Sequence, residues 1–296
     1  MTLIKNKKFK AIFKGIDISS REIIDNQYDS KKYPYIGMGN PDSKVLFVGA
    51  EKGFDPEESS VINKHELNLN YIHWQDILLN HNNLNDHLHP RLKLREGLTG
   101  FNPFSPLSLD VTCNRVYSIG GHTYKQMEKI CNASLLAFHS VSPKNIFQVS
   151  PHFYNESMFK YCFLTELSDL PKKTSEKGVL FSNDDFKKSA RYSAIKGLLG
   201  DFYRSFKTVV IYAGRKYAET HCTTQRLDVI KLFNPKLNCN DLINHGNGAN
   251  GQWLYDVYKS SKGGAKVVVC RHIVSQGTTA HDLEQLIGVI GMGDIL

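Results

Sequence analysis

The stretch KVLFVGAEKG, residues 44–53, decides the expected fold because a continuous apolar run ends there in a polar, glycine-containing segment. An apolar run of strand length without alternation is typical of a strand buried on both faces, as in a parallel sheet. In an open α/β sheet, ligands bind at the carboxyl ends of the strands. Glu51 therefore falls at the expected chemical edge, where Gly49 and Gly53 would let a ligand or a second loop approach the backbone. The alternative is that Glu51 is an ordinary exposed loop glutamate.

Three more apolar runs of strand length follow. They are FKYCFLTEL (residues 159–167), TVVIYAG (208–214) and KVVVCRH (266–272). Helical periodicity or capping signals predict helices at residues 59–79, 124–138, 183–206, 252–260 and 280–290, and near Tyr217. Residues 244–251 are expected to form a flexible turn. Strands that alternate with helices imply a parallel sheet with helices on both faces. The expected fold is therefore α/β, a three-layer αβα sandwich around a central, mostly parallel four-stranded sheet.

The pattern indicates one main domain. We expect this domain to cover residues 35–296, with a largely helical insertion at about 54–160. Residues 1–34 carry many lysines and form a basic N-terminal extension. This extension is either a basic arm or an edge layer of the domain, and such an arm would either contact phosphate or simply be solvated.

Composition narrows the function classes. The formal net charge of +8 favours a polyanionic partner, with nucleic acid as the first candidate. No apolar run approaches the roughly 20 residues that span a bilayer, and the first residues lack a signal-peptide pattern, so we expect a cytoplasmic protein without a membrane partner. The six cysteines form no C-x-x-C pair, so no metal site is expected, and most should be buried apolar residues.

The four strand ends, in their order and identity, resemble those of the uracil-DNA glycosylase superfamily. The matching segments are GAEKG (residues 49–53), TEL (165–167), YAG (212–214) and RHIVS (271–275), and the resemblance in layout covers about residues 35–290. It implies that Glu51 orients the attacking water and stabilises the cationic sugar, as a carboxylate can. It also implies that His272 stabilises negative charge on the departing base. The cysteine ligands of the iron–sulfur branch are absent, so neither a cluster nor another cofactor is expected.

Glu166 is the most informative departure from the family pattern. It matches the family asparagine whose amide recognises uracil. An ionised carboxylate cannot donate, but it can accept from the exocyclic amine of cytosine. Uracil is therefore disfavoured and a cytosine-type base favoured. The alternative is a strand-end glutamate paired with Lys172 or Lys173.

Further residues are expected to hold the base and the DNA backbone. Gly53 stands where the classical branch has a tyrosine that blocks C5 of the pyrimidine, so its small size leaves room for a C5 substituent. Aromatic residues expected to stack on the base are Phe54, Phe101 and Phe104. Residues expected to contact DNA are Lys52, Lys172, Lys173, Arg271, Ser275 and Gln276; Gln276 and Ile273 replace an apolar wedge and a proline of the classical branch.

These assignments favour one function and leave two alternatives. The first is a monomeric, monofunctional DNA glycosylase that excises a C5-substituted cytosine, such as the glucosylated hydroxymethylcytosine of phage DNA, and leaves an abasic site. Such an enzyme would serve anti-phage defence. The alternatives are repair of uracil or another deaminated base, and a non-catalytic DNA-binding module.

Overall fold

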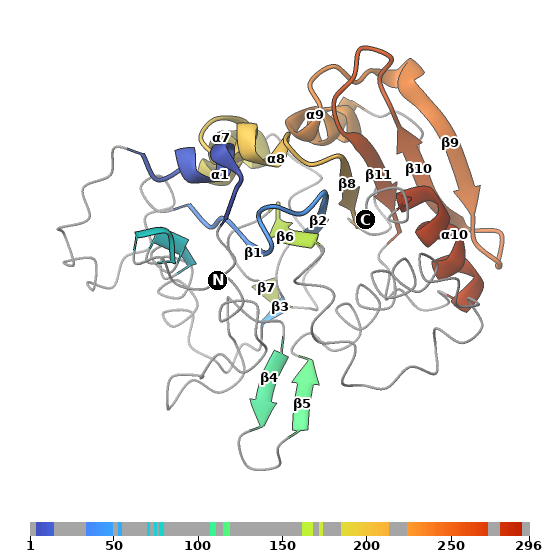
Figure 1. Ribbon diagram of the computed structural model, residues 1–296. Helices are drawn as coiled ribbons and strands as arrows, with labels where there is room; N and C mark the ends of the chain where they lie inside the picture. Colours follow the sequence, from blue (N-terminus) through green and yellow to red (C-terminus); the bar gives the residue numbers. More distant parts are fainter. Residues whose placement is uncertain are drawn as a thin grey trace.

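The structure is a computed structural model. The residues that it describes are 4–14, 34–49, 53–54, 70–71, 74–75, 77–79, 107–110, 115–118, 162–167, 172–173, 185–212, 224–271 and 279–291. Figure 1 labels most of the elements formed by these residues.

A seven-stranded sheet organises the fold, in the order β1-β6-β2-β8-β11-β10-β9. The four predicted runs form its centre as β6 (Cys162–Glu166), β2 (Val45–Gly49), β8 (Thr208–Ile211) and β11 (Lys266–Cys270). Neighbours among these four strands pair in parallel. The prediction of an α/β fold with a parallel centre is therefore confirmed.

The predicted number of strands was wrong, because antiparallel strands extend both sides of the parallel centre. β1 (Met38–Gly39) pairs with β6, and β10 (Trp253–Tyr258) pairs with β11 on one side and with β9 (Leu242–Asn247) on the other. The sheet is consequently mixed.

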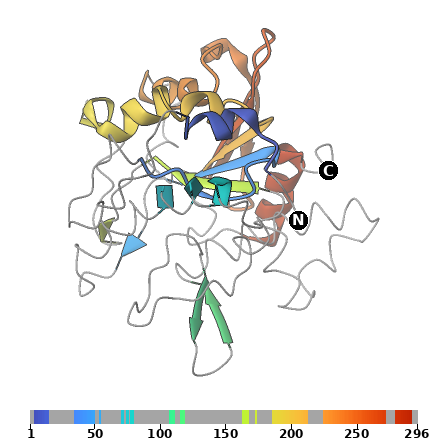
Figure 2. The same ribbon diagram turned by 60° about the vertical axis from the view of Figure 1, so that its left-hand side comes forward.

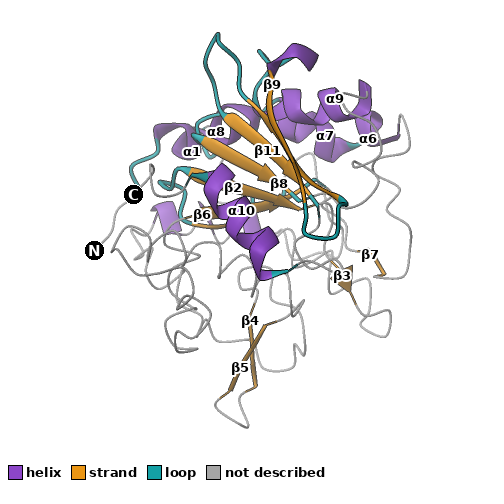
Figure 3. Ribbon diagram, turned by 90° about the vertical axis from the view of Figure 1, so that its right-hand side faces the viewer, coloured by secondary structure: helices purple, strands orange, loops and turns teal. Residues whose placement is uncertain are grey.

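Helices cover both faces of the sheet, which gives the expected three layers. One face packs against α1 (Lys7–Ala11), α7 (Ala190–Lys196), α8 (Gly200–Tyr203) and α9 (Thr224–Phe233), as Figure 2 shows. The other packs against α10 (Ala280–Ile290), as Figure 3 shows. We call these the multi-helix face and the α10 face. The predicted bounds of α10 are confirmed, and Lys266 Nζ secures its end by donating to the carbonyls of Val289 (2.8 Å) and Ile290 (3.0 Å).

The segment 252–260 was predicted to be a helix, but it contains β10. Its core, WLYDVY, consists largely of aromatic and β-branched residues, which favour strands when neighbours are available for pairing. The segment predicted as a flexible turn supplies that neighbour, because β9 ends at Asn247 and a short turn joins it to β10. The cross-strand pair of His245 and the fully buried Asp256, 2.7 Å apart from Nδ1 to Oδ1, fixes the hairpin register.

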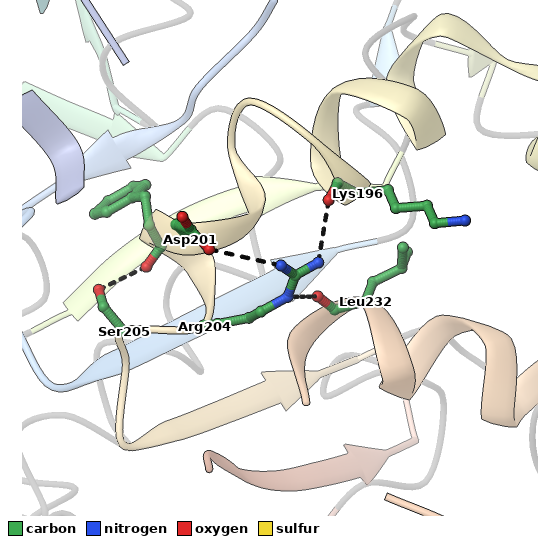
Figure 4. Close-up of polar contacts among 6 residues, drawn as sticks. Lys196, Asp201, Arg204, Ser205 and Leu232 are labelled. Atoms are coloured by element: carbon green, nitrogen blue, oxygen red, sulfur yellow. Dashed lines mark hydrogen bonds and ion pairs between the residues drawn. The ribbon is translucent and has the colours of Figure 1, made fainter. Parts of the chain in front are cut away.

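The single helix predicted from about 183 to 206 is instead three short helices, α6 (Asp185–Lys188), α7 and α8. Ser189 causes the first break, because its hydroxyl donates to the carbonyl of Phe186 (2.7 Å) and accepts from the backbone N–H of Tyr192 (3.0 Å). Arg204 then ties the pieces to their neighbours by donating to the carbonyls of Lys196 and Leu232, each at 3.1 Å (Figure 4).

The described part of the N-terminal extension, residues 4–14, is an edge layer of the domain. Phe9 of α1 is fully buried, and its ring lies edge-on to Trp74 and Phe202 with centroids 5.0 and 4.9 Å apart. The backbone N–H groups of Lys5 and Asn6 donate to the carboxylate of Asp42, just before β2. Residues 4–14 therefore form an edge layer, which is one of the two alternatives predicted for the extension.

The expected insertion at about 54–160 lies mostly outside the described residues. Within it the structure describes helical residues at 70–71, 74–75 and 77–79, inside the helix predicted for 59–79, and a hairpin of β4 (Leu107–Asp110) and β5 (Arg115–Ser118). The side chains of Asn70 and Trp74 donate to the carbonyl of Gly37, at 2.9 and 2.8 Å. Gly37 has φ of 127°, and a Cβ there would collide with the carbonyl of Leu164, so this position requires glycine.

Asp282 joins α10 to the β9–β10 turn. Its carboxylate accepts from the backbone N–H groups of Thr279 and Ala249, both at 2.8 Å, in a capping box. Burial disfavours the ionised form, but hydrogen bonds from the backbone of Thr279 and Ala249 and from the Thr279 hydroxyl, together with nearby His281, outweigh burial and lower the pKa of Asp282.

We predict that Asp282→Asn lowers the free energy of unfolding by about 1 kcal/mol at pH 7, the usual value of an N-terminal cap. Because the pKa of Asp282 is depressed in the folded state, its stabilisation is present above the unfolded-state pKa of about 3.9 and is lost as the pH falls through the folded-state pKa. The difference between the two proteins in urea unfolding should therefore shrink below about pH 4. Glu284→Gln, at an exposed position of the same helix, is the control and should change stability little. A pH-independent difference would contradict the assignment.

Candidate functional site

The site forms at the carboxyl edge of the parallel strands, where their spatial order reverses. The chain runs from β2 to β6 on one side and then returns to β8 on the other side of β2. Ligand sites in open α/β sheets lie at such a switch point. The residues at the ends of these three strands are Gly49, Glu166 and Tyr212, the last directly following β8.

Side-chain alternation places all three residues on the α10 face. Gly49 continues the series Val45 and Phe47, Glu166 continues Cys162 and Leu164, and Tyr212 continues Val210; the apolar members and Tyr212 belong to one buried cluster with α10. Gly49 and Glu166 are direct register partners in the β2–β6 pair.

Gly49 gives space to the two polar side chains beside it. A Cβ on Gly49 would overlap Oε2 of Glu166 and would lie 2.6 Å from the hydroxyl of Tyr212. The carboxylate therefore leans from β6 across β2 toward β8, and the hydroxyl approaches the same point from β8. The sequence led us to expect that a ligand or loop approaches this glycine, whereas the structure places the side chains of Glu166 and Tyr212 there.

Glu166 and Tyr212 bring polar atoms into an otherwise apolar environment. Their exposed fractions are only 6% and 4%. Burying a carboxylate is costly unless hydrogen bonds or charges compensate for lost water. A group kept in such a place at the edge of a sheet is a candidate for binding a ligand.

Arg191 fixes the backbone of Glu166 from the multi-helix face. Its Nε and Nη2 donate to the carbonyl of Glu166 at 3.1 and 2.7 Å, and Nη2 also donates to Oγ1 of Thr165 at 2.8 Å. Nη1 donates to the carbonyl of Tyr35. With Arg191 only 2% exposed, these bonds form inside the protein, where they strongly restrict movement.

Cys270, at the end of β11, also lies on the α10 face and carries a thiol. Burial raises the pKa of its thiol to about 12, so the sulfur stays protonated and is a poor nucleophile. Cys162 and Cys270 are buried thiols outside any disulfide, in line with the expectation that most cysteines are buried, whereas the exposed Cys239 is disulfide-bonded. The described part of the site therefore offers a carboxylate and a hydroxyl as its chemical groups.

The structure brings two of the predicted groups together. β3 (Gly53–Phe54) pairs in parallel with β7 (Lys172–Lys173), so the segment expected to hold the base lies beside the lysines expected to contact DNA. β3 follows β2 and β7 follows β6, so this small ladder begins within a few residues of Gly49 and Glu166 in the chain. The side chains of these four residues lie outside the described part of the structure, as does the alternative ion pair of Glu166.

Several predicted residues lie outside the described residues. They are Glu51, Lys52, Phe101, Phe104, His272, Ser275 and Gln276. Arg271 is described and is 9% exposed, which is low for a residue expected to contact phosphate; its backbone N–H donates to the carbonyl of Leu254 at 2.8 Å. A phosphate contact by Arg271 stays a prediction.

Sequence reasoning assigned no role to Tyr212 or Arg191. The period of two along TVVIY could have placed the Tyr212 side chain on the same face as that of Glu166. No local signal identifies Arg191, because Glu166, Thr165 and Tyr35, to which it donates, are 25, 26 and 156 residues away in the chain.

Comparison with models of known protein families, with curated proteins and with solved structures found no match. Within the described residues, no three or more histidine, cysteine or acidic side chains gather as metal ligands would. Likewise, none of the helices described is both long enough and apolar enough to span a bilayer.

We predict that Gly49→Ala destabilises the protein by about 1–3 kcal/mol, the usual cost of overpacking, because the new methyl group overlaps the Glu166 carboxylate. The free energy of unfolding from urea titrations measures this cost. Gly288→Ala is the matched control: it adds the same methyl group to an exposed site of α10 with no neighbour within 4 Å, and should stabilise by about 0.5–1 kcal/mol. The cost should shrink in a Glu166→Ala background; an unchanged cost would place the collision elsewhere.

Proposed function

We propose that this protein is a monofunctional DNA glycosylase that excises a C5-substituted cytosine from DNA. The observation that carries the proposal is the buried carboxylate of Glu166, which lies at the switch point of the sheet and leans over Gly49. Its support is the agreement between this place and the position that the family resemblance assigns to the residue that recognises the base.

The chemistry of Glu166 selects the base. An ionised carboxylate only accepts hydrogen bonds, and cytosine presents an exocyclic amine where uracil presents a carbonyl oxygen. A uracil placed with that oxygen against Glu166 would bring two acceptors together. A flipped cytosine would instead offer the carboxylate a donor. Gly53, in β3 next to β7, is the residue that would leave room for a C5 substituent.

Glu51 and His272 are the proposed catalytic groups. In the chain Glu51 follows the end of β2 by two residues and His272 follows the end of β11 by two residues, and both of these strands end at the carboxyl edge of the parallel centre. In the proposed reaction, the glycosidic C–N bond breaks and the base leaves with the electron pair, stabilised by His272. Water attacks the sugar carbon and gives its proton to Glu51, which leaves an abasic site.

The decisive assay uses single base substitutions in one oligonucleotide. Purified protein is incubated with matched substrates that carry cytosine, 5-hydroxymethylcytosine, glucosylated 5-hydroxymethylcytosine or uracil, in single and double strands. Alkaline cleavage then scores abasic sites. We expect cleavage of the substituted cytosines above uracil. Preference for uracil would instead favour repair, and binding without any base release would favour a non-catalytic module.

We predict that Glu51→Gln reduces base release at least 10²- to 10⁴-fold, the usual contribution of a general base. Its affinity for the same DNA should change little, because Glu51 acts on water and the sugar cation rather than on phosphate. Single-turnover cleavage and fluorescence anisotropy measure the two quantities. Glu284→Gln makes the same change at an exposed site of α10 and should keep full activity. Wild-type turnover by Glu51→Gln would remove Glu51 from the mechanism.

We predict that Glu166→Gln shifts the preference from cytosine toward uracil. Glutamine keeps the length of the side chain but adds a donor that can reach the O4 atom of uracil. A good polar pairing discriminates by about 1–3 kcal/mol, or roughly ten- to a hundredfold in the ratio of kcat/KM values. A competition assay with substituted cytosine and uracil measures this ratio. Equal losses on both substrates would mean that Glu166 does not recognise the exocyclic group.

A further inference from the structure

We propose that the amino edge of the parallel strands is a surface that binds the phosphate backbone of DNA without reading its sequence. The residues that carry this inference are four exposed lysines, Lys5, Lys207, Lys236 and Lys262, which we call the amino-edge lysines. They are far apart in the chain, yet contacts of their backbones and of one side chain bring them to the same edge. This inference goes beyond the proposed function, because the edge lies at the opposite end of the strands from the candidate site.

Lys5 and Lys207 lie beside the beginnings of β2 and β8. The backbone N–H of Lys5 donates to the carboxylate of Asp42 at 2.8 Å, in the segment just before β2. The backbone N–H of Lys207, the residue before β8, donates to the carbonyl of Lys44, the residue before β2, at 2.9 Å. The two lysines therefore lie at the amino ends of two adjacent strands.

Lys262 and Lys236 continue the row on the far side of β8. Lys266 begins β11, and its backbone N–H donates to the carbonyl of Lys207 at 2.9 Å. Lys262 lies in the turn that joins β10 to β11, and its carbonyl accepts from Nζ of Lys236 at 2.8 Å. The positive charge thus extends across the amino ends of β2, β8 and β11 as far as the turn from β10.

The length of this row suits a DNA backbone. Neighbouring strands lie about 4.8 Å apart, so the four adjacent strands from β2 to β10 extend over roughly 15 Å. The phosphates of one DNA strand are spaced by about 3.4 Å along the helix axis, so roughly four of them face an edge of this length. The amino-edge lysines can therefore pair with phosphates along one line. Contacts between lysine and phosphate carry no sequence information.

The folded chain leaves the charges of the amino-edge lysines available. Lys266 offers a contrast, because its Nζ serves the fold by donating to the last carbonyls of α10. Within the part of the chain that the structure describes, no group bonds to Nζ of Lys5, Lys207 or Lys262. Lys236 donates only to a neutral carbonyl and so keeps its charge unpaired by a carboxylate.

The described acidic side chains near the row have other partners. The carboxylate of Asp42 accepts from the backbone N–H groups of Lys5 and Asn6. Asp201, in α8, lies 3.8 Å from Nη1 of Arg204. The described part of this edge therefore carries an excess of positive charge, which attracts a polyanion.

The amino edge is separate from the candidate site. The five-residue strands β2 and β6 rise by about 3.3 Å per residue and so hold the two edges roughly 17 Å apart. The amino-edge lysines can therefore add affinity for DNA without contacting the base or the reacting atoms.

The test neutralises three of the lysines and measures how DNA binding depends on salt. The triple variant Lys5→Gln/Lys207→Gln/Lys262→Gln spares Lys236, which holds the turn before β11. Fluorescence anisotropy gives the Kd for one unmodified duplex between about 50 and 200 mM salt, the range in which phosphate contacts weaken strongly. The variant Lys5→Arg/Lys207→Arg/Lys262→Arg keeps the charges, and Lys188→Gln removes an exposed lysine of α6 as a control. Thermal unfolding verifies that the variants fold.

We expect the slope of log Kd against log salt concentration to fall by about 0.9 for each lysine removed, and by about 2.7 in the triple glutamine variant. The triple arginine variant and Lys188→Gln should keep the wild-type slope. An unchanged slope in the triple glutamine variant, or an equal fall per charge in Lys188→Gln, would overturn the inference. Binding of the wild-type protein to phosphatidylserine vesicles but not to DNA would also overturn it, in favour of an anionic membrane.

The design separates this inference from the proposed function, because the duplex contains no modified base. If the wild-type protein releases no base but its salt slope depends on the amino-edge lysines, the glycosylase assignment fails and the DNA-binding edge stands. If base release occurs and the triple glutamine variant keeps the wild-type slope, the glycosylase assignment stands and the DNA-binding edge fails.

Discussion

The buried guanidinium of Arg191 is the contact on which the centre of this structure depends. It donates to the carbonyls of Tyr35 and Glu166 and to Oγ1 of Thr165, and so joins the segment before β1, the end of β6 and helix α7. A buried cation is tolerated only where its donors are satisfied, and losing one partner leaves a charge in a low-dielectric interior. The end of β6 therefore cannot shift without a large cost in free energy, and the position of Glu166 is tied to the stability of the fold.

The last two residues of β6 point to opposite faces of the sheet and have different roles. Thr165 points to the multi-helix face, where its hydroxyl donates to the carbonyl of Ile36 at 3.0 Å and contacts Arg191. Glu166 points to the α10 face and meets Gly49 and Tyr212. A slip of one residue in the register would turn each side chain to the opposite face. The Glu166 carboxylate would then lie among the aromatic rings of the multi-helix face. The multi-helix face thus anchors the strand whose last residue forms the site.

The sequence allowed the parallel centre to be predicted because each of its strands is a continuous apolar run, a signal that does not depend on partners. The helix at 280–290 was equally local, with Thr279 and Asp282 as a capping box. β10 could not be predicted in this way, because its residues become a strand only when β9 and β11 pair with them. The break at Ser189 was missed for a similar reason, since a helical apolar pattern continues through a serine whose hydroxyl bonds to the backbone. In the site, Glu166 could be placed at a strand end from the sequence, but its lean toward Tyr212 depends on three strands meeting in space.

The residue type at position 49 depends on the length of the side chain at position 166. A Cβ at position 49 would occupy the volume of Oε2 of Glu166, so glycine is needed because the facing side chain is long and turned across the strand. A short side chain at position 166 would remove that collision, but it would also remove the carboxylate from beside the Tyr212 hydroxyl. Within the described strand ends, glycine, glutamate and tyrosine therefore form one unit: β2 supplies the space, β6 the charge and β8 the hydroxyl. A change at any one of the three alters the space left to the other two, even though each residue comes from a different strand of the sheet.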